Sequence, residues 1–446
     1  MDIRTLLNKM NIEVVDVEGG KSDIKLWNSW YKGCVSEVHK YSVYNGVKKV
    51  SQTRKSLRMA KRVCEDWANL LLNEKVVISV NNEESDKVLK DVLKKNNFCV
   101  NANRLIEISF ALGTGAFVES RRDGKVKIDF VRAEYIYPLS CEGGVITGCA
   151  FGQEIKNGKK RSYYIQAHVP NENGGYDVHN GLFDENGVAL PLGDAVEVVF
   201  HSEKKLFQII TPNKVNARRT DSPFGASVFS DALDVLAGID ITFDSFINEF
   251  KLGKKRLVVP MSMAKKMLNE KGEMIPVFDS NDVAFYAMEG SEEEKSKLQE
   301  IDMNLRIEEH INALECILSV LSDRCGLGSG RYSYKERANA VKTAEEVISD
   351  KSELYQNIKK HELVLEDALI SMADAILFLS GMPENEASVM FDDSIIENKA
   401  AEFTKYMELQ AAGDIAPWEV RMWWTGESEK EAKKACEEIA EGFGDE

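Results

Sequence analysis

The sequence predicts an α+β protein in which a region of hairpins and helices is followed by long helices. From Val76 to about Ile210, short β-branched and aromatic runs alternate with turn residues. From Ser227 onward, apolar residues recur at helical spacing over long stretches. A chain of 446 residues is too long for one simple core, so we expect two to four structural regions.

Composition and terminal patterns narrow the class of protein. With 43% hydrophobic and 29% charged residues, the chain is typical of a folded soluble protein. Met1 to Glu18 lacks the basic end and apolar run of a signal peptide. The longest apolar run, Ala373 to Leu379, is much shorter than a membrane span and predicts the end of a buried helix. Eight scattered cysteines without a Cys-x-x-Cys pair predict reduced, buried thiols of a cytosolic protein.

The charge balance argues against a protein that grips DNA tightly. The chain has 57 basic and 73 acidic residues, a formal net charge of −16. An acidic surface repels phosphate, so a conventional DNA-binding protein is disfavoured.

The first segment, to about Asn73, is predicted to be helical. Apolar residues between Leu57 and Leu71 recur at spacings of three and four. The opposite face carries Lys55, Arg58, Lys61 and Arg62. For this basic run a solvated face or a contact between subunits is favoured over nucleic acid.

The segment from Val76 to about Ile210 is predicted to form antiparallel hairpins with one helix near Asn101–Leu112. Turn pairs such as Asn157-Gly158 and Asn186-Gly187 separate the strands. The clearest strand patterns are Val76–Val80, Val126–Val131 and Val196–Phe200.

A long helix over Ser227–Lys251 comes next, with Asp221 and Ser222 as candidate caps and Gly253 at its end. Its 25 residues correspond to a rod of roughly 37 Å. A compact insert, Leu257 to about Gly290, follows. We expect strands at Leu257–Val259 and Val283–Met288, and a short helix near Ala264–Leu268.

A second long helix, with apolar residues from Ile307 to Leu321 on one face, ends at the glycine-rich loop Gly326–Gly330. Ala338–Leu379 then predicts about forty helical residues without glycine or proline. Asp392–Glu446 predicts two or three short helices.

No catalytic motif, metal site or cofactor site is predicted. Gly326–Gly330 lacks the Gly-Lys-Ser/Thr of a phosphate loop, so a flexible loop between helices is favoured. His361-Glu362 lacks the second histidine of a metalloprotease and predicts an exposed helix position. Asp392-Asp393 lacks a third ligand, which favours helix capping near Ser394. A structural or assembly component is favoured over an enzyme whose site assembles in space.

Several strings, taken in order, resemble phage portal proteins, especially those of long-tailed phages of Gram-positive bacteria. The first stem helix and the start of the clip of that family are similar to Pro223–Phe229, Asp240–Phe246, Glu249–Arg256 and Val259-Pro260. Its wing is similar to Lys61–Glu74, Ala111–Phe117 and Ala133–Pro138, its long helix to Lys342–Ser349, and its crown to Asp392–Glu438.

The resemblance implies a portal fold with a mixed α/β wing, a helical stem, a small α/β clip insert, a long tunnel helix and a helical crown. The implied regions are the wing (1–226), first stem helix (227–256), clip (257–300), second stem helix (301–325), tunnel loop (326–337), long helix and return to the wing (338–391) and crown (392–446).

The resemblance also implies a dodecameric ring at one capsid vertex, assembled in the host cytoplasm, that passes double-stranded DNA during packaging, retention and ejection. The implied partners are the large subunit of terminase, the major capsid and scaffold proteins and a head–tail adaptor, with no membrane and no enzymatic activity. Twelve chains of charge −16 carry −192, so an acidic channel would let DNA slide. A different ring or shell component, such as a head–tail adaptor, is the alternative within the same class.

By position in that fold, the tunnel loop would bring Arg331, Tyr332, Tyr334 and Lys335 close to DNA. The alternative is that these side chains pack against the neighbouring subunit's loop. The start of the clip carries Lys254, Lys255 and Arg256, which would pair with Glu292–Glu294 of a neighbouring subunit. The acidic end, Glu427–Glu446, would face packaged DNA or scaffold.

Overall fold

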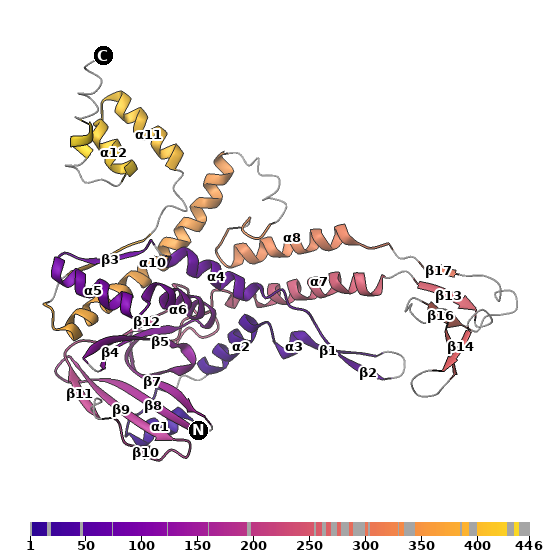
Figure 1. Cartoon of the computed structure of the whole chain (residues 1–446), viewed down its shortest axis with the longest axis horizontal. Coiled ribbons are helices and arrows are strands. Elements are labelled where there is room, and N and C mark those ends of the chain that lie inside the picture. The colour runs from indigo at the N-terminus through magenta and orange to yellow at the C-terminus, as the bar shows by residue number, and fades with distance from the viewer. Residues whose placement is uncertain are drawn as a thin grey trace. The chain divides into compact units, whose positions relative to one another are not determined.

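Mostly antiparallel strands and long helices make up the described part of the chain, shown in Figure 1 as a computed structural model. The predicted α+β class is confirmed. The structure describes residues 2–15, 19–44, 48–73, 75–122, 124–158, 160–193, 198–253, 256–260, 265–268, 274–277, 285–288, 299–301, 304–328, 330–333, 344–383, 386–391, 399–425 and 432–436. Two compact units emerge, one of Met1–Asn73 and Ile78–Val389, the other of Glu74–Val77 and Met390–Glu446.

The largest sheet of the first unit has six antiparallel strands. Five of them follow the order β10-β9-β8-β7-β6, and the sixth, β11, pairs with β9. Glycines at φ +57° and +82°, Gly143 and Gly144, make the tight turn between β6 and β7. The predicted Asn186-Gly187 turn is confirmed, with the backbone N–H of Gly187 donating to Asp184. The strands are β6 (Ile136–Glu142), β7 (Val145–Asn157), β8 (Lys160–Pro170), β9 (Tyr176–Asp184), β10 (Ala189–Leu190) and β11 (Val199–Ser202).

Helix α1 (Ile3–Lys9) covers one face of this sheet. Leu6 and Leu7 are buried against Tyr137, Ile165 and their neighbours on the inner strands. Burial of these side chains fixes the N-terminal segment on the sheet, since each fully buried leucine contributes roughly 1.5–3 kcal/mol.

A three-stranded sheet, β12-β4-β5, packs against helices α6 and α10. The apolar side chains Leu365, Leu369, Met372 and Ile376 recur along α10 and are buried. The predicted buried end of this helix is therefore confirmed. The elements are β4 (Gly115–Arg122), β5 (Lys125–Arg132), β12 (Phe207–Ile210), α6 (Phe98–Leu112) and α10 (Ala344–Ser380).

Helices α2 (Gly20–Lys32) and α4 (Met59–Leu71) pack on α6, and α5 (Glu83–Lys95) packs on α10. The side chain of Asn82 caps α5 by accepting from the N–H groups of Glu84 and Ser85. Strands β3 (Val77–Val80) and β18 (Ala387–Met390) pair with each other.

The prediction of an all-helical first segment is wrong for residues 40–44 and 49–53, which are strands. A short helix, α3 (Ser36–His39), leads into a hairpin of β1 (Lys40–Tyr44) and β2 (Lys49–Thr53). Its strands lack a buried face, so no apolar alternation marked them in the sequence.

The two long helices of the middle region are α7 (Leu233–Leu252) and α8 (Ile307–Arg324), which pack against each other. The expected start at Ser227 and caps at Asp221 or Ser222 are wrong, because α7 begins at Leu233 after a turn of 3₁₀ helix, Ser230–Ala232. The preceding residues pack on the end of α6: the N–H of Gly225 donates to the Thr114 hydroxyl, and Val228 donates to the Phe110 carbonyl. A Cβ on Gly225 would lie 2.4 Å from the carbonyl oxygen of Gly113, so this contact requires glycine.

The insert between α7 and α8 contains short strands in the described residues. Strands β13 (Arg256–Pro260) and β16 (Phe285–Met288) agree with the two expected strands and pair with each other in parallel. Strand β17 (Gln299–Ile301), which was not expected, pairs with β13 on its other side. The expected helix near Ala264–Leu268 is wrong: Lys265–Leu268 is strand β14, which pairs with β15 (Met274–Val277).

The second unit contains α11 (Lys399–Ala412), α12 (Pro417–Thr425) and helical residues 432–436. Tyr406 stacks on Trp423 with ring centroids 4.5 Å apart, and Lys433 lies over the Trp418 ring. These aromatic contacts join its helices.

All eight cysteines are free thiols. Cys64, Cys149 and Cys325 are buried, but Cys34, Cys99 and Cys316 are exposed, so the prediction of buried thiols is wrong for the latter three.

Glu119 on β4 is a buried carboxyl group whose effect on folding can be measured. Its side chain is fully buried, and burial raises its pKa to about 8. The pKa of Glu119 is higher in the folded chain than in the unfolded chain, so its protonated form stabilises the fold. This stabilisation is complete below the unfolded pKa and is lost as the pH rises toward 8.

We therefore expect Glu119→Gln to gain stability relative to the unmodified chain between pH 5 and pH 8. Between the unfolded and the folded pKa of Glu119, the difference in free energy of unfolding between the two proteins grows by about 1.4 kcal/mol for each pH unit. Chemical denaturation at the two pH values measures it. Glu185→Gln, at an exposed turn position, is the control and should show no such trend; an equal trend in both variants would contradict the assignment.

Candidate functional site

The described part of the segment after α8, residues 325–328 and 330–333, is held against the body of the first unit at two places. Gly326 and Gly328 adopt positive φ angles, +75° and +76°, which turn the chain back on itself. Leu327 donates from its backbone to Ser322, and the Ser322 hydroxyl donates to the carbonyl of Gly328. The described part of the predicted flexible loop is therefore hydrogen-bonded to the end of α8.

Trp67 of α4 fixes the start of this segment. Its indole N–H donates to the carbonyl of Cys325 at 3.1 Å, and the ring is buried. From α10, the side-chain amide of Asn357 donates to the carbonyl of Gly326, also at 3.1 Å. Two helices far apart in the sequence thus bind consecutive carbonyls at the end of α8.

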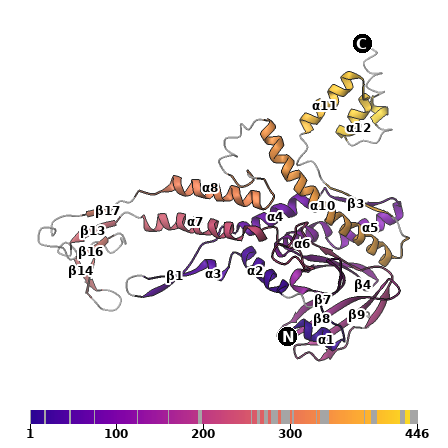
Figure 2. The same cartoon turned by 180° about the vertical axis from the view of Figure 1, so that it is seen from behind.

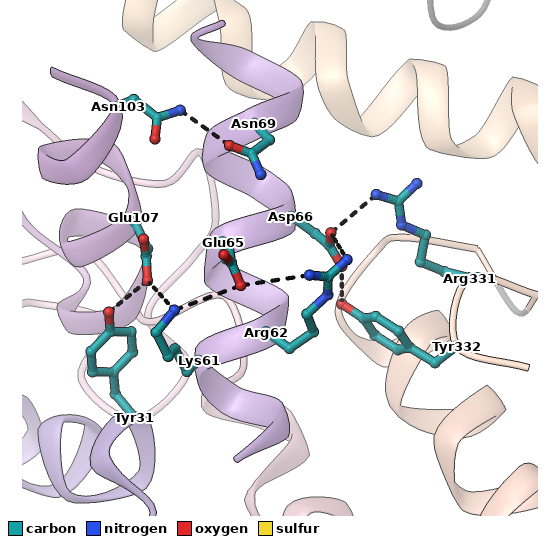
Figure 3. Close-up of polar contacts among 10 residues, drawn as sticks. All are labelled: Tyr31, Lys61, Arg62, Glu65, Asp66, Asn69, Asn103, Glu107, Arg331 and Tyr332. Atoms are coloured by element: carbon teal, nitrogen blue, oxygen red, sulfur yellow. Dashed lines mark hydrogen bonds and ion pairs between the residues drawn. The ribbon is translucent and has the colours of Figure 1, made fainter. Parts of the chain in front are cut away.

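Asp66, the residue before Trp67, binds the other end of the segment. The residue is only 2% exposed, and Arg331 Nη2 lies 3.1 Å from its Oδ1. The Tyr332 hydroxyl donates to Oδ2 at 2.9 Å, and Arg62 Nη2 also lies 3.1 Å from Oδ1 (Figure 3). Both carboxylate oxygens of a buried charge are therefore paired, as a buried carboxylate requires.

Tyr332 is buried as a result, with 6% of its surface exposed. Burial and the adjacent Asp66 carboxylate raise the pKa of its phenol well above the ordinary value, so it stays a hydrogen-bond donor. Ser333 then donates its hydroxyl to Glu315 of α8 at 2.9 Å.

The basic face predicted on α4 makes contacts within the chain. Lys61 lies 3.4 Å from Glu107 of α6 and 3.6 Å from Glu65, while Arg62 also contacts Glu65 (Figure 3). Tyr31 of α2 donates to Glu107 at 2.6 Å, and burial followed by this hydrogen bond raises the pKa of its phenol. These pairs join α2, α4 and α6.

His361 of α10 lies behind Trp67, and the prediction that it is exposed is wrong. It is 9% exposed, edge-on to the Trp67 ring at 4.7 Å, and its Nδ1 accepts from the backbone N–H of Asn213. Burial lowers its pKa to about 3, so the ring is neutral.

The predicted site residues divide between the described and undescribed parts of the chain. Arg331 and Tyr332 lie together at Asp66, whereas Tyr334, Lys335, Lys254 and Lys255 lie outside the described residues, as do Asp392 and Asp393. Arg256 begins β13, where its backbone is in register with Ile301.

Sequence reasoning missed Asp66, Asn357 and the burial of His361. A signal for Asp66 exists in the sequence, since an acidic residue stands at the edge of the apolar stripe Val63, Trp67 and Leu70. Asn357 and His361 carried no such signal.

Among the described residues, no group of three or more histidine, cysteine, aspartate or glutamate side chains is placed to hold a metal ion. No described helix is long and apolar enough to span a membrane.

Residues 18–442 match the sequence family described as "Phage portal protein, SPP1 Gp6-like". The chain belongs to the phage portal protein family. The match spans both the compact body and the second unit of this portal chain. No curated protein sequence matches the chain.

Three solved structures are similar to this portal chain at 13% sequence identity. Each match covers 82% of this chain and 88% of the chain in the solved structure. They are the virion of a native gene transfer agent particle (TM-score 0.38), the neck of an empty particle computed with C6 symmetry (0.39) and the neck of a native particle computed with C12 symmetry (0.35). Likeness at this level supports no functional conclusion.

We expect Tyr332→Phe to lower the free energy of unfolding by about 1–2 kcal/mol, because it leaves Oδ2 of a buried carboxylate without its donor. Chemical denaturation at a fixed protein concentration measures the loss. Tyr355→Phe, at an exposed position on α10, is the matched control, and an equally small effect in both variants would show that the Asp66 contact is unimportant.

Proposed function

We propose that copies of this chain assemble into a closed ring with an axial channel at one vertex of a phage capsid. Membership of the portal family supports the role, and the α7–α8 pair supports the assembly. Large apolar side chains on and beside these helices are 37–46% exposed: Ile241, Phe250, Leu305, Ile307, Ile311 and Val320. An apolar surface of this kind is typical of a contact between proteins.

A ring covers such a surface on both sides. In a cyclic assembly, one side of each copy meets the opposite side of the next copy, so every copy gains two contacts. We propose twelve copies, assembled in the host cytoplasm and retained in the virion.

Double-stranded DNA would pass through the channel during packaging, remain behind it during retention and leave through it during ejection. The net charge of −16 for each chain supports a conduit in which DNA slides, because a strongly basic lining would hold phosphates. The motor activity would belong to the large subunit of terminase, docked first on the insert between α7 and α8. A head–tail adaptor would replace it, while major capsid and scaffold proteins surround the ring.

A weak contact with DNA would come from the tunnel loop, at Arg331, Tyr334 and Lys335. The Arg331 side chain is 33% exposed although its guanidinium contacts Asp66, and Arg62 shares the same carboxylate oxygen. Tyr332 would fix the base of the loop instead of touching DNA, since it is buried on Asp66. At the start of the clip, Lys254, Lys255 and Arg256 would contact Glu292–Glu294 of a neighbouring subunit.

Electron microscopy of the purified full chain tests the ring directly. We expect twelve-fold particles with an axial hole, because the exposed apolar residues of α7 and α8 are covered only by neighbours. Small globular particles at every concentration examined would contradict the proposal.

Arg331→Ala/Lys335→Ala tests the contact between loop and DNA. We expect rings of normal size but a several-fold loss of packaged DNA per particle, because phosphate contacts are removed from the channel. The pair Lys87→Ala/Lys94→Ala on the exposed face of α5 removes the same charge elsewhere. Normal packaging in the loop variant would refute the contact with DNA.

A further inference from the structure

The β1–β2 hairpin is an isolated two-stranded ribbon. Neither strand pairs with a third strand in the described part of the chain, and eight of its ten residues are exposed. Figures 1 and 2 show the hairpin extending away from α3. Isolated hairpins are marginally stable in water, so a ribbon of this kind gains from a partner surface.

The base of the hairpin is fixed to α7. His39 Nε2 lies 2.8 Å from Asp240 Oδ2, with both side chains buried. The backbone N–H of Leu57 donates to Asp240 at 2.7 Å, and that of Lys55 donates to Asp244 at 3.0 Å. The Tyr41 hydroxyl also reaches Asp244, at 3.4 Å. The direction of the hairpin is therefore set by α7.

The hairpin is basic within an acidic protein. The hairpin and the two residues that follow it, 40–55, contain five basic and no acidic residues, which leaves a net charge of −21 for the other 430. Because side chains alternate along a strand, Lys40, Ser42 and Tyr44 lie on the face opposite Tyr41, and therefore away from α7. The register places Lys49 beside Tyr44, which is 64% exposed. We call this surface the outer face of the hairpin; it combines Lys40, Ser42, Tyr44, Lys49, Ser51 and Thr53.

Helix α7 lies between the hairpin and α8. Contacts with α8 involve Phe246, whose ring lies 5.8 Å from that of His310, and Glu249, which pairs with Arg306 at 3.0 Å. At 3.6 residues per turn, Asp240 and Asp244 point nearly opposite to these two residues. The hairpin base and α8 therefore occupy opposite sides of α7.

The side of α8 turned away from α7 is acidic and partly apolar. Arg306, His310 and Ile317 face α7. Glu308, Ile311 and Glu315 lie on the opposite side by helical spacing. Glu308 and Ile311 are exposed, whereas Glu315 is half-buried and also accepts the Ser333 hydroxyl of its own chain. We call these three residues the outer face of α8. Its charge is opposite to that of the outer face of the hairpin.

We infer that the outer face of the hairpin docks on the outer face of α8 in a second copy of this chain. In a head-to-tail ring, opposite sides of neighbouring copies meet, and these two surfaces lie on opposite sides of α7. Lys40 and Lys49 oppose Glu308 and Glu315, and Tyr44 covers Ile311. This inference rests on the proposed ring and specifies which surfaces close it.

Photo-crosslinking from position 44 tests the contact in the full chain. Tyr44 is replaced by a photoreactive phenylalanine analogue of similar shape, and equal amounts of ¹⁵N-labelled and unlabelled protein are mixed before assembly. We expect crosslinked peptides of mixed isotope composition that join position 44 to residues 305–316. Rings that form with crosslinks only within one chain, or to another surface, would overturn the inference and leave the ring proposal intact.

A charge exchange tests the same contact without a crosslinker. Lys49→Glu and Glu308→Lys should each raise the protein concentration needed for assembly, by about tenfold, because like charges then face each other across the contact. The double variant should recover most of the loss. Lys87→Glu, an equal change of charge on α5, should leave assembly unchanged.

Native mass spectrometry at increasing concentration supplies the measurement. Failure of the double variant to recover would overturn the pairing. If Lys49→Glu left assembly unchanged but lowered retention of duplex DNA, nucleic acid would be the partner and the inference would be wrong. An unmodified chain that stays monomeric throughout would overturn both this inference and the proposed ring.

Discussion

The buried carboxylate of Asp66 is the constraint on which the middle of the chain depends. A charge that is 2% exposed must be paired, and Arg62 of the same helix reaches only one of its oxygens. The second oxygen is bound by Tyr332, which can reach it only if the segment after α8 folds back onto α4. Since Trp67 binds the carbonyl of Cys325, two consecutive residues of α4 hold the start of that segment and its residues 331 and 332.

The contacts of Asp66 with Arg62, Arg331 and Tyr332 specify the conformation of the segment after α8 and contribute little net stability. Removing a carboxylate from water costs several kcal/mol, and the gain from its partners is of similar size. An apolar residue at this position would pack on α4 but would give Arg331 and Tyr332 no particular place. With Asp66 in place, the segment that leaves α8 has a defined direction up to Ser333, whose hydroxyl donates to Glu315. In the proposed ring, such a fixed origin would give the loop the same starting position in every copy.

The sequence predicted those elements whose pattern is local and long. Helices α7, α8 and α10 each carry an apolar face over many turns, and the turn at Asn186-Gly187 has a distinctive residue pair. The β1–β2 hairpin was missed because exposed strands carry no alternation of apolar residues. The strand Lys265–Leu268 was predicted as a helix because only its pairing with Met274–Val277 makes it a strand, and the local residue pattern does not show that pairing. His361 was misjudged for a similar reason: Trp67 and Phe110, which bury it, lie more than 250 residues away in the sequence.

Basic residues near the loop, Lys61, Arg62 and Arg331, are bound to carboxylates of their own chain. Their charge is thereby neutralised locally, which weakens any long-range attraction for phosphate. The β1–β2 hairpin differs from this region, since residues 40–55 contain no acidic side chain. In the proposed ring its charge is neutralised by the neighbouring copy, so that assembly itself removes a basic surface. Burial of this basic surface between copies would leave fewer basic groups exposed on a closed ring than on a free subunit, which would favour DNA sliding through rings over DNA binding to free subunits.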